Sequence, residues 1–193
     1  FFRQNLNIPR SRLLLLGNGI DQKLLKKNKK ILPKTPTLLY IGSLSQHKDI
    51  PTLISAHQLL LARFPDLKLI IAGHKTLFYP QIAPLLKKAN IKTVYSFSNQ
   101  KLSGIIDSAT ILVSPSLQES FGLVLIEALA RRTPVIAADI PASTEIIKLS
   151  GGGLTFKQSN ASDLAQKISL LLTQPQKYIK YSQDGFNYVS KHL

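Results

Sequence analysis

The stretch TILVSPSLQESFGLVLIEALARRTPVIAAD, residues 110–139, predicts a strand, a helix and a second strand in direct succession. Residues 110–116 contain no charged residue and include three apolar residues in succession, which is typical of a parallel strand covered on both faces. Residues 120–132 carry apolar side chains around the whole axis of a helix, which predicts that this helix is buried. Residues 134–139 give the next strand. A strand–helix–strand unit of this kind favours a parallel α/β sheet.

The same alternation continues on both sides of this stretch. Further strands are expected at 36–42, 66–73, 91–97 and 151–156, and a strand that runs into a glycine turn is expected at 12–21. Helices are expected at 50–65, 79–90, 99–109, 141–150, 162–172 and 178–193. Pro84 is expected to split or kink its helix, and Asn99 is the expected N-cap of the next helix.

These elements predict the fold class α/β, with a doubly wound, Rossmann-like parallel sheet of about six strands and helices on both faces. Residues 1–193 are expected to form a single domain. Within it, residues 1–34 are a connecting segment with a strand and a basic run, and residues 176–193 are a closing helix. Because ligands bind such sheets at the carboxyl ends of the strands, chemistry is expected in the loops that follow the strands.

The composition restricts the class of protein. Apolar residues make up 44% of the chain and charged residues 18%, which predicts a globular domain rather than a disordered one. The sequence has no cysteine, so no disulfide or thiolate metal site is expected. Its four histidines lack the spacing of metal ligands, and no metal is predicted. No apolar run reaches the ~18 residues that a membrane-spanning helix needs.

The net charge of +15 leaves two interpretations open. One is an anionic partner, such as nucleic acid, phosphate groups or an anionic membrane surface. The other is a solvated surface over which lysines are scattered, with one cluster at residues 23–34. Because no nucleic-acid recognition motif is present, we expect no nucleic acid as a partner. An NAD-binding domain is disfavoured because no G-x-G-x-x-G motif follows an early strand.

Glu127 is the only charge inside the helix predicted to be buried. A carboxylate removed from water is costly unless it is paired or hydrogen-bonded. Either a basic side chain or the hydroxyls of a ligand must meet it. The start of the same helix, around Ser120 to Leu123, predicts free amides for a phosphate, and Gly122 allows close approach. The alternative is that Glu119 and Ser120 only cap the helix.

The run PSLQESFGLVLIEALARRTPVIA resembles the signature of the family-four retaining glycosyltransferases of the GT-B fold. That signature contains two glutamates with seven residues between them, as at Glu119 and Glu127, and Phe121 and Gly122 occupy the family's positions. The resemblance continues through LLGNGID, LLYIGSLSQHKDIPTLISA, DLKLIIAG and VYSFSNQKLSGIIDSATILVSPS, in the family's order. It covers nearly the whole chain.

The resemblance implies a nucleotide-sugar donor, a UDP- or GDP-sugar, as substrate and no cofactor. Glu127 would accept hydrogen bonds from the ribose hydroxyls, and Glu119 would contact the donor sugar. Lys48 would neutralise the diphosphate, and the amides of Phe121, Gly122 and Leu123 would hold its distal phosphate. With Lys48 and Glu119 as catalytic residues, the remaining predicted donor contacts are Gly42, Ser43, His47, Gly73, Phe97 and Ser120. The candidates for contact with the base are Gly73, His74, Tyr95, Phe97 and Leu102, although Tyr95 and Phe97 are also typical core residues.

The sequence departs from the family's pattern at one place. Many members have an arginine at the position of Ser43, and some have it at the position of His47. Arg3 or a lysine could compensate for the missing charge. Two functions therefore stay open: a retaining, metal-independent hexosyltransferase, and a degenerate module that binds nucleotide sugars without catalysis.

The resemblance also implies that residues 1–193 are the C-terminal, donor-binding half of a longer protein. The N-terminal half of the same protein would contact a carbohydrate or lipid-linked acceptor in cell-surface polysaccharide or glycolipid synthesis. The absence of methionine, even at position 1, agrees with a missing upstream part. This half alone is expected to be inactive. A cytoplasmic location is expected, with peripheral attachment at the anionic inner face of the membrane as a further hypothesis.

Overall fold

The computed structural model describes residues 19–193 except residues 27, 89, 96 and 97. Its centre is a six-stranded parallel sheet with the order β3-β2-β1-β4-β5-β6. The strands are β1 (Thr37–Ile41), β2 (Lys68–Ala72), β3 (Ile91–Val94), β4 (Ile111–Ser114), β5 (Val135–Ala138) and β6 (Gly153–Phe156). The strand order reverses between β1 and β4, which confirms the predicted doubly wound sheet.

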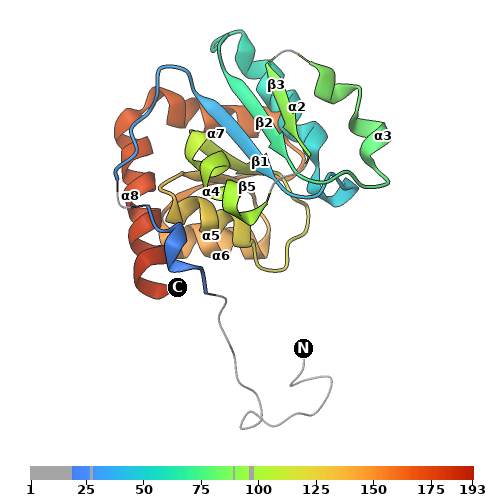
Figure 1. The fold of residues 1–193 in the computed structure, drawn as a ribbon. Coiled ribbons are helices and arrows are strands. Elements are labelled where there is room, and N and C mark those ends of the chain that lie inside the picture. The colour runs from blue at the N-terminus through green and yellow to red at the C-terminus, as the bar shows by residue number, and fades with distance from the viewer. Residues whose placement is uncertain (1–18, 27, 89, 96–97) are drawn as a thin grey trace, which may run out of the picture.

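Helices cover both faces of this sheet (Figure 1). On one face, α2 (Ile50–Leu61) and α7 (Ala161–Thr173) pack on the core that contains Leu38, Tyr40 and Val113. On the other face lie α4 (Asn99–Ser108), α5 (Leu123–Ala130) and α6 (Pro141–Ser150), on a second core that contains Leu39 and Leu112. Successive strand residues enter opposite cores because side chains alternate along a strand. The last helix, α8 (Pro175–His192), contacts α5, α6 and α7.

Several helix boundaries differ from the prediction. The helix expected at 120–132 begins only at Leu123, because Gly122 has a φ of 77° and ends the preceding loop. The helix expected at 79–90 is split as predicted, into α3 (Tyr79–Ile82) and the 3-10 helix η4 (Leu85–Lys87), with Pro84 as the N-cap of η4. The expected N-cap at Asn99 is wrong: Ser98 takes that position, and Asn99 is the first residue of α4.

The connecting segment packs beside α5. The strand predicted at 12–21 lies outside the described residues except for its last three, which are not in a strand. They are followed by the short 3-10 helix η2 (Gln22–Leu24). Leu24 and Leu25 are partly buried against the second core, and the amide of Lys26 donates to the carbonyl of Ala130 over 3.0 Å. This segment appears in blue next to α5 and α8 in Figure 1.

Gly73 allows the carboxyl ends of β1 and β2 to approach each other. A Cβ at this position would lie 1.7 Å from the carbonyl oxygen of Gly42, so no larger residue fits. The amide of Gly42 donates to Ala72, and that of Gly73 donates to Val94. Both predicted glycines therefore shape the edge of the sheet at which ligands are expected.

Candidate functional site

The loops after β1 and β4 meet at the carboxyl edge of the sheet, where the strand order reverses. The amide of Leu117 donates to the carbonyl of His47 over 2.8 Å. The Nζ of Lys48 donates to Oε1 of Glu119 over 2.5 Å. These two side chains are only 16% and 18% exposed. The structure therefore places side by side the two residues for which catalytic roles are predicted.

A chain of hydroxyl groups supports the loop after β1. The buried phenol of Tyr40 donates to the carbonyl of Ser43 over 2.7 Å. The Oγ of Ser43 lies 3.0 Å from the Oγ of Ser45, which lies 3.4 Å from Nε2 of His47. Ser43 and His47 thus take part in the same loop network, on the side of the site that carries Lys48. They supply hydroxyl and imidazole groups at the two positions where the resemblance led us to look for an arginine, found in many members at that of Ser43 and in some at that of His47.

A shallow polar pocket of about 350 Å³ lies at this junction. Among the described residues that line it, the permanently charged groups are one ammonium and one carboxylate, and these two groups pair with each other. Ser120, a predicted donor contact, is exposed at the same pocket. The lining residues are His47, Lys48, Gln118, Glu119 and Ser120.

In the sequence, α5 begins shortly after the last residues that line this pocket. Gly122 is its N-cap with a φ of 77°, and no side chain caps the helix. The alternative in which Glu119 or Ser120 caps this helix is therefore wrong. A Cβ on Gly122 would lie 3.1 Å from Cδ1 of Ile146 and would also meet backbone strain, so glycine fits best. The uncapped amides at the start of α5 are able to bind an anion.

Glu127 lies in the second turn of α5 and is half-buried. Within the described residues its carboxylate makes no hydrogen bond or ion pair, so the predicted alternative of a pairing lysine is not observed. Burial raises the pKa of this carboxyl above its usual value. Arg131, one helical turn further on, pairs with Asp107 instead. Glu127 lines neither the polar pocket nor the apolar pocket that adjoins it.

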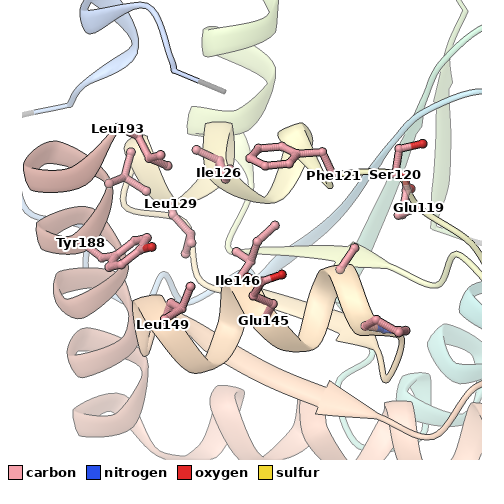
Figure 2. Close-up of a pocket in the computed structure, with 13 residues that line it drawn as sticks. Glu119, Ser120, Phe121, Ile126, Leu129, Glu145, Ile146, Leu149, Tyr188 and Leu193 are labelled. Atoms are coloured by element: carbon pink, nitrogen blue, oxygen red, sulfur yellow. The ribbon is translucent and has the colours of Figure 1, made fainter. Parts of the chain in front are cut away.

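An apolar pocket of about 470 Å³ lies between α5, α6 and α8 (Figure 2). It shares Glu119 and Ser120 with the polar pocket, so the two pockets are neighbours. No sequence pattern predicts this pocket, because its walls come from three helices whose apolar faces look like ordinary core. Its lining consists of Glu119, Ser120, Phe121, Ile126, Leu129, Pro141, Ala142, Glu145, Ile146, Leu149, Tyr188, Val189 and Leu193.

The predicted base contacts are spread along the neighbouring strand ends. His74 is exposed, and its carbonyl accepts from the amide of Leu44 in the loop after β1. Tyr95 packs edge-to-face on Tyr79, and the ammonium of Lys75 lies 4.4 Å from the centre of the Tyr95 ring. Tyr95 is therefore already part of an aromatic cluster. Leu102 packs partly buried against the second core. Phe97 and Arg3 lie outside the described residues.

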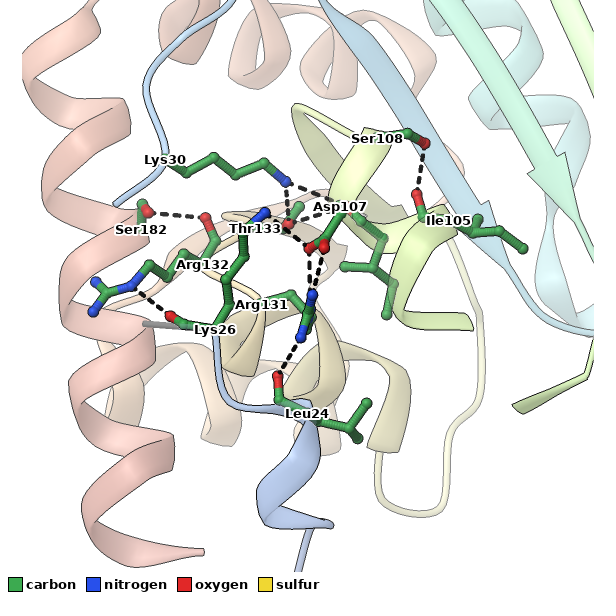
Figure 3. Close-up of polar contacts among 11 residues, drawn as sticks. Leu24, Lys26, Lys30, Ile105, Asp107, Ser108, Arg131, Arg132, Thr133 and Ser182 are labelled. Atoms are coloured by element: carbon green, nitrogen blue, oxygen red, sulfur yellow. Dashed lines mark hydrogen bonds and ion pairs between the residues drawn. The ribbon is translucent and has the colours of Figure 1, made fainter. Parts of the chain in front are cut away.

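Two arginines at the end of α5 hold the connecting segment rather than the pocket (Figure 3). Arg131 binds the carboxylate of Asp107 through Nε and a terminal nitrogen, and it donates to the carbonyl of Leu24 over 3.1 Å. Arg132 donates through Nε to the carbonyl of Lys26 over 2.9 Å. The ammonium of Lys26 lies 3.3 Å from the same Asp107.

Lys30 completes this contact. Its Nζ donates to Oγ1 of Thr133 over 2.7 Å and to the carbonyl of Ile106 over 3.2 Å. Burial lowers the pKa of Lys30 to about 8, although the nearby carboxylate of Asp107 acts in the opposite direction. Three segments distant in the sequence, around residues 24–30, 105–107 and 131–133, are thereby joined. The polar groups of these three segments bind one another and so stabilise the fold.

Two features are absent from the described residues. No group of three or more histidine or acidic side chains among them could hold a metal ion. None of the helices that the structure describes is long and apolar enough to cross a membrane.

Residues 21–187 match the protein family described as glycosyl transferases group 1. One relative is the GDP-mannose:cellobiosyl-diphosphopolyprenol alpha-mannosyltransferase of Xanthomonas campestris, 28% identical over 172 residues, which are 85% of this chain and 44% of the relative. The chain spans about half the length of the relatives that it matches. For three of them the matched share of the relative is 44–46%.

Two solved structures show the same fold. One is the C-terminal domain of the group 1 glycosyl transferase LpcC from Francisella tularensis, with a TM-score of 0.77 and 20% identity over 90% of this chain and 98% of that one. The other is HepE from Anabaena in complex with UDP and glucose, with a TM-score of 0.76 and 21% identity over 91% of this chain and 51% of that one.

Proposed function

Because the chain belongs to the glycosyl transferases group 1 family, we propose that it is the C-terminal, donor-binding half of a retaining, metal-independent glycosyltransferase. The donor is a UDP- or GDP-sugar. The N-terminal half of the same protein contributes the acceptor site, and this half alone turns over nothing. Two observations support this division: the chain matches about half of its relatives, and one solved domain of the same extent is a C-terminal one.

The observation that carries the proposal is the contact of Lys48 with Glu119 at the carboxyl edge, directly before the uncapped start of α5. A diphosphate in the polar pocket would meet the Lys48 ammonium and the amides of Phe121, Gly122 and Leu123. When the bond to the sugar breaks, negative charge develops on the diphosphate. A fixed cation stabilises that transition state more than the ground state. Glu119 would bind the hydroxyls of the sugar.

Glu127 is proposed to bind the ribose of the donor. Its carboxylate is half-buried and makes no polar contact with the described residues, and burial raises its pKa. The two ribose hydroxyls would satisfy it as neutral donors, so that no second charge needs to be buried. Neither pocket reaches this residue, so the ribose would have to extend along α5 beyond the polar pocket.

The relatives support a nucleotide sugar and a lipid-linked acceptor. HepE holds UDP and glucose, and the Xanthomonas relative is named for GDP-mannose and a diphosphopolyprenol acceptor. We therefore place the reaction in cell-surface polysaccharide or glycolipid synthesis. The protein would work in the cytoplasm at the inner face of the membrane, where its net charge of +15 favours an anionic surface.

A degenerate, non-catalytic nucleotide-sugar-binding module is the second candidate, and one observation favours it. Of the described residues that line the polar pocket, one carries a permanent cation, Lys48, and that cation is already paired with Glu119. Ser43 and His47 add no permanent charge. The full-length protein, assayed against a panel of nucleotide sugars and lipid-linked acceptors, separates the two candidates, because sustained transfer excludes the module.

Calorimetry on the chain tests the binding site. Wild type is titrated with UDP-glucose and GDP-mannose, and so is the variant Glu127→Ala. The variant is expected to lose at least tenfold in affinity for the bound donor, because two hydrogen bonds to a carboxylate are removed. Asp66→Ala is the control, since Asp66 is exposed next to the amino end of β2, at the opposite edge of the sheet. An unchanged affinity in Glu127→Ala would show that the ribose assignment is wrong.

A further inference from the structure

The two charged groups of the polar pocket, on Lys48 and Glu119, are paired with each other. Nζ of Lys48 and Oε1 of Glu119 are 2.5 Å apart, within one charge-assisted hydrogen bond. Among the described residues, the Lys48 ammonium has no other hydrogen-bond partner. The groups that would receive phosphate and sugar are therefore not free before a ligand arrives. Any ligand that takes Lys48 must first separate this pair.

The partners of this pair are anchored unequally. Glu119 keeps a second hydrogen bond, because Oγ of Ser116 donates to its Oε1 over 2.9 Å. Ser116 is itself buried and lies 3.5 Å from Oγ of Ser114 at the end of β4. Lys48 holds Glu119 only with the end of its flexible side chain, while its backbone is fixed in the 3-10 helix η3 (Gln46–Lys48). The ammonium is thus the partner that can move away.

We propose that Glu119 is an internal competitor for Lys48, so that the domain binds a nucleotide sugar in preference to a free nucleoside diphosphate. The sugar hydroxyls of the donor replace the ammonium on Glu119, and the released Lys48 turns to the diphosphate. A nucleoside diphosphate brings no such hydroxyls, so it separates the pair without giving Glu119 a new partner. This inference rests on the proposed function, in which Lys48 and Glu119 contact the donor.

This competition has a consequence for the direction of the reaction. Once the sugar has been transferred, Glu119 loses its hydroxyl partners and recaptures the ammonium of Lys48. The nucleoside diphosphate then loses its cation and faces a carboxylate, so its release is favoured. The pair therefore selects the intact donor on binding and weakens the hold on the product. The position that binds the diphosphate and the position that binds the sugar are thus coupled through a single ion pair.

Calorimetry with the chain separates this proposal from the alternatives. UDP, GDP, UDP-glucose and GDP-mannose are titrated into wild type, Glu119→Gln, Lys48→Met and the double variant. Glu119→Gln is expected to bind the free diphosphate of the preferred base about 5–30-fold more tightly, within the range usual for coupled sites. Its affinity for the nucleotide sugar does not rise, so the preference for the intact donor over the free diphosphate falls.

The double variant tests the mechanism. If Glu119 acts by holding Lys48, the gain in diphosphate affinity disappears in the Lys48→Met background, because no cation is left to release. If the gain persists there, Glu119 merely repels phosphate and the proposal is wrong. The proposal is also wrong if Glu119→Gln, with Lys48 still present, binds the diphosphate no more tightly than wild type does. Thermal unfolding of each variant checks that the isosteric change leaves the fold intact.

The outcome distinguishes this proposal from the proposed function. If wild type binds nucleotide sugars but Glu119→Gln shows no gain in affinity for the free diphosphate, the internal competition is overturned and the proposed function is not. If neither wild type nor any variant binds a nucleotide or a nucleotide sugar, the proposed function fails, and the competition fails with it.

Discussion

Buried polar residues at single positions determine how this domain responds to pH. His57 is completely buried in α2, and its Nε2 donates to the carbonyl of Leu67 over 2.9 Å. The side-chain amide of Gln58 approaches Nδ1 at 3.3 Å and donates to it. Both ring nitrogens are therefore satisfied in the neutral tautomer. Burial lowers the pKa of His57 below its usual 6.5, although the hydrogen bond to Leu67 acts in the opposite direction.

The first prediction concerns the stability of the fold in acid. In the unfolded chain His57 takes up a proton near pH 6.5, whereas in the folded chain it does so only at lower pH. The stability from neutral His57 is therefore complete above pH 6.5 and is lost as the pH falls from there through the lowered pKa. We expect the free energy of unfolding, measured by urea denaturation, to fall over this range.

The variant His57→Gln isolates this effect, because glutamine can still donate to Leu67 but does not titrate. Its free energy of unfolding should depend less on pH in the same window. His74→Gln serves as the control, since His74 is exposed just after β2 and the substitution removes a histidine without changing the core. A pH dependence that is identical in His57→Gln and wild type would contradict the assignment.

At the scale of elements, two glycines show how closely helices approach. Gly185 in α8 lies against α5: a Cβ there would be 2.5 Å from Cδ2 of Leu129 and 3.1 Å from the Cα of Gly152. Gly104 in α4 is exposed, and a Cβ there would meet nothing within 4 Å. The same substitution therefore has opposite consequences in two helices.

The second prediction compares these positions. Gly185→Ala should lower the free energy of unfolding by about 1–3 kcal/mol, because the added methyl group overpacks the contact of α8 with α5. Gly104→Ala should raise it by roughly 0.5–1 kcal/mol, because alanine loses less backbone entropy in a helix. Urea denaturation of both variants measures the difference. Equal effects of the two substitutions would show that α8 does not pack closely on α5.

The boundary of α5 shows the limit of helix prediction at this scale. Apolar periodicity over 120–132 indicates a helix, but periodicity carries no information about φ. Gly122 adopts a φ of 77° and Arg132 one of 58°, so the helix is confined between them. The shorter helix leaves Glu119 and Ser120 in a loop, where they reach the polar pocket. A longer helix would have turned these side chains elsewhere.

At the scale of the whole molecule, a polar contact fastens the connecting segment to both α4 and α5. Asp107 receives Arg131 and Lys26, and Lys30 reaches Thr133 on the other side (Figure 3). Burial opposes the ionisation of Asp107, but the hydrogen bonds and charges of Arg131 and Lys26 outweigh it and lower the pKa of this carboxyl. The segment that leads into the domain is therefore part of its tertiary structure.

The third prediction is that Asp107→Asn loosens this segment. Two cations lose their counter-charge, and because the site is about a quarter exposed to solvent, the free energy of unfolding should fall by only about 1–2 kcal/mol. Amide exchange at Lys26, which donates to Ala130, should become faster. Asp184→Asn is the control, because its pair with Lys180 lies on the surface of α8. Unchanged exchange at Lys26 would show that Asp107 does not hold the segment.

The fourth prediction concerns the net charge of +15. If the excess charge serves a membrane surface, the chain should sediment with vesicles that contain anionic lipid and not with neutral ones, with a contribution of about 1 kcal/mol for each basic residue near the surface. Salt at about 0.5 M should release it, because the Debye length then shrinks to about 4 Å. Equal retention on both kinds of vesicle, or on neither, would leave scattered solvated lysines as the explanation of the charge.

The order of strands and helices could be predicted from the sequence, because apolar periodicity and turn residues act locally along the chain. The sequence also indicated Glu119, Gly122 and Glu127, since a charge in an apolar helix and a glycine at its start are visible without coordinates. It could not show that Lys48 is paired with Glu119, that Glu127 has no polar partner among the described residues, or that three helices line an apolar pocket. These features depend on which loops and helix faces meet across the sheet. They are visible only in the folded domain, because side-chain partners are set by distances between segments far apart in sequence.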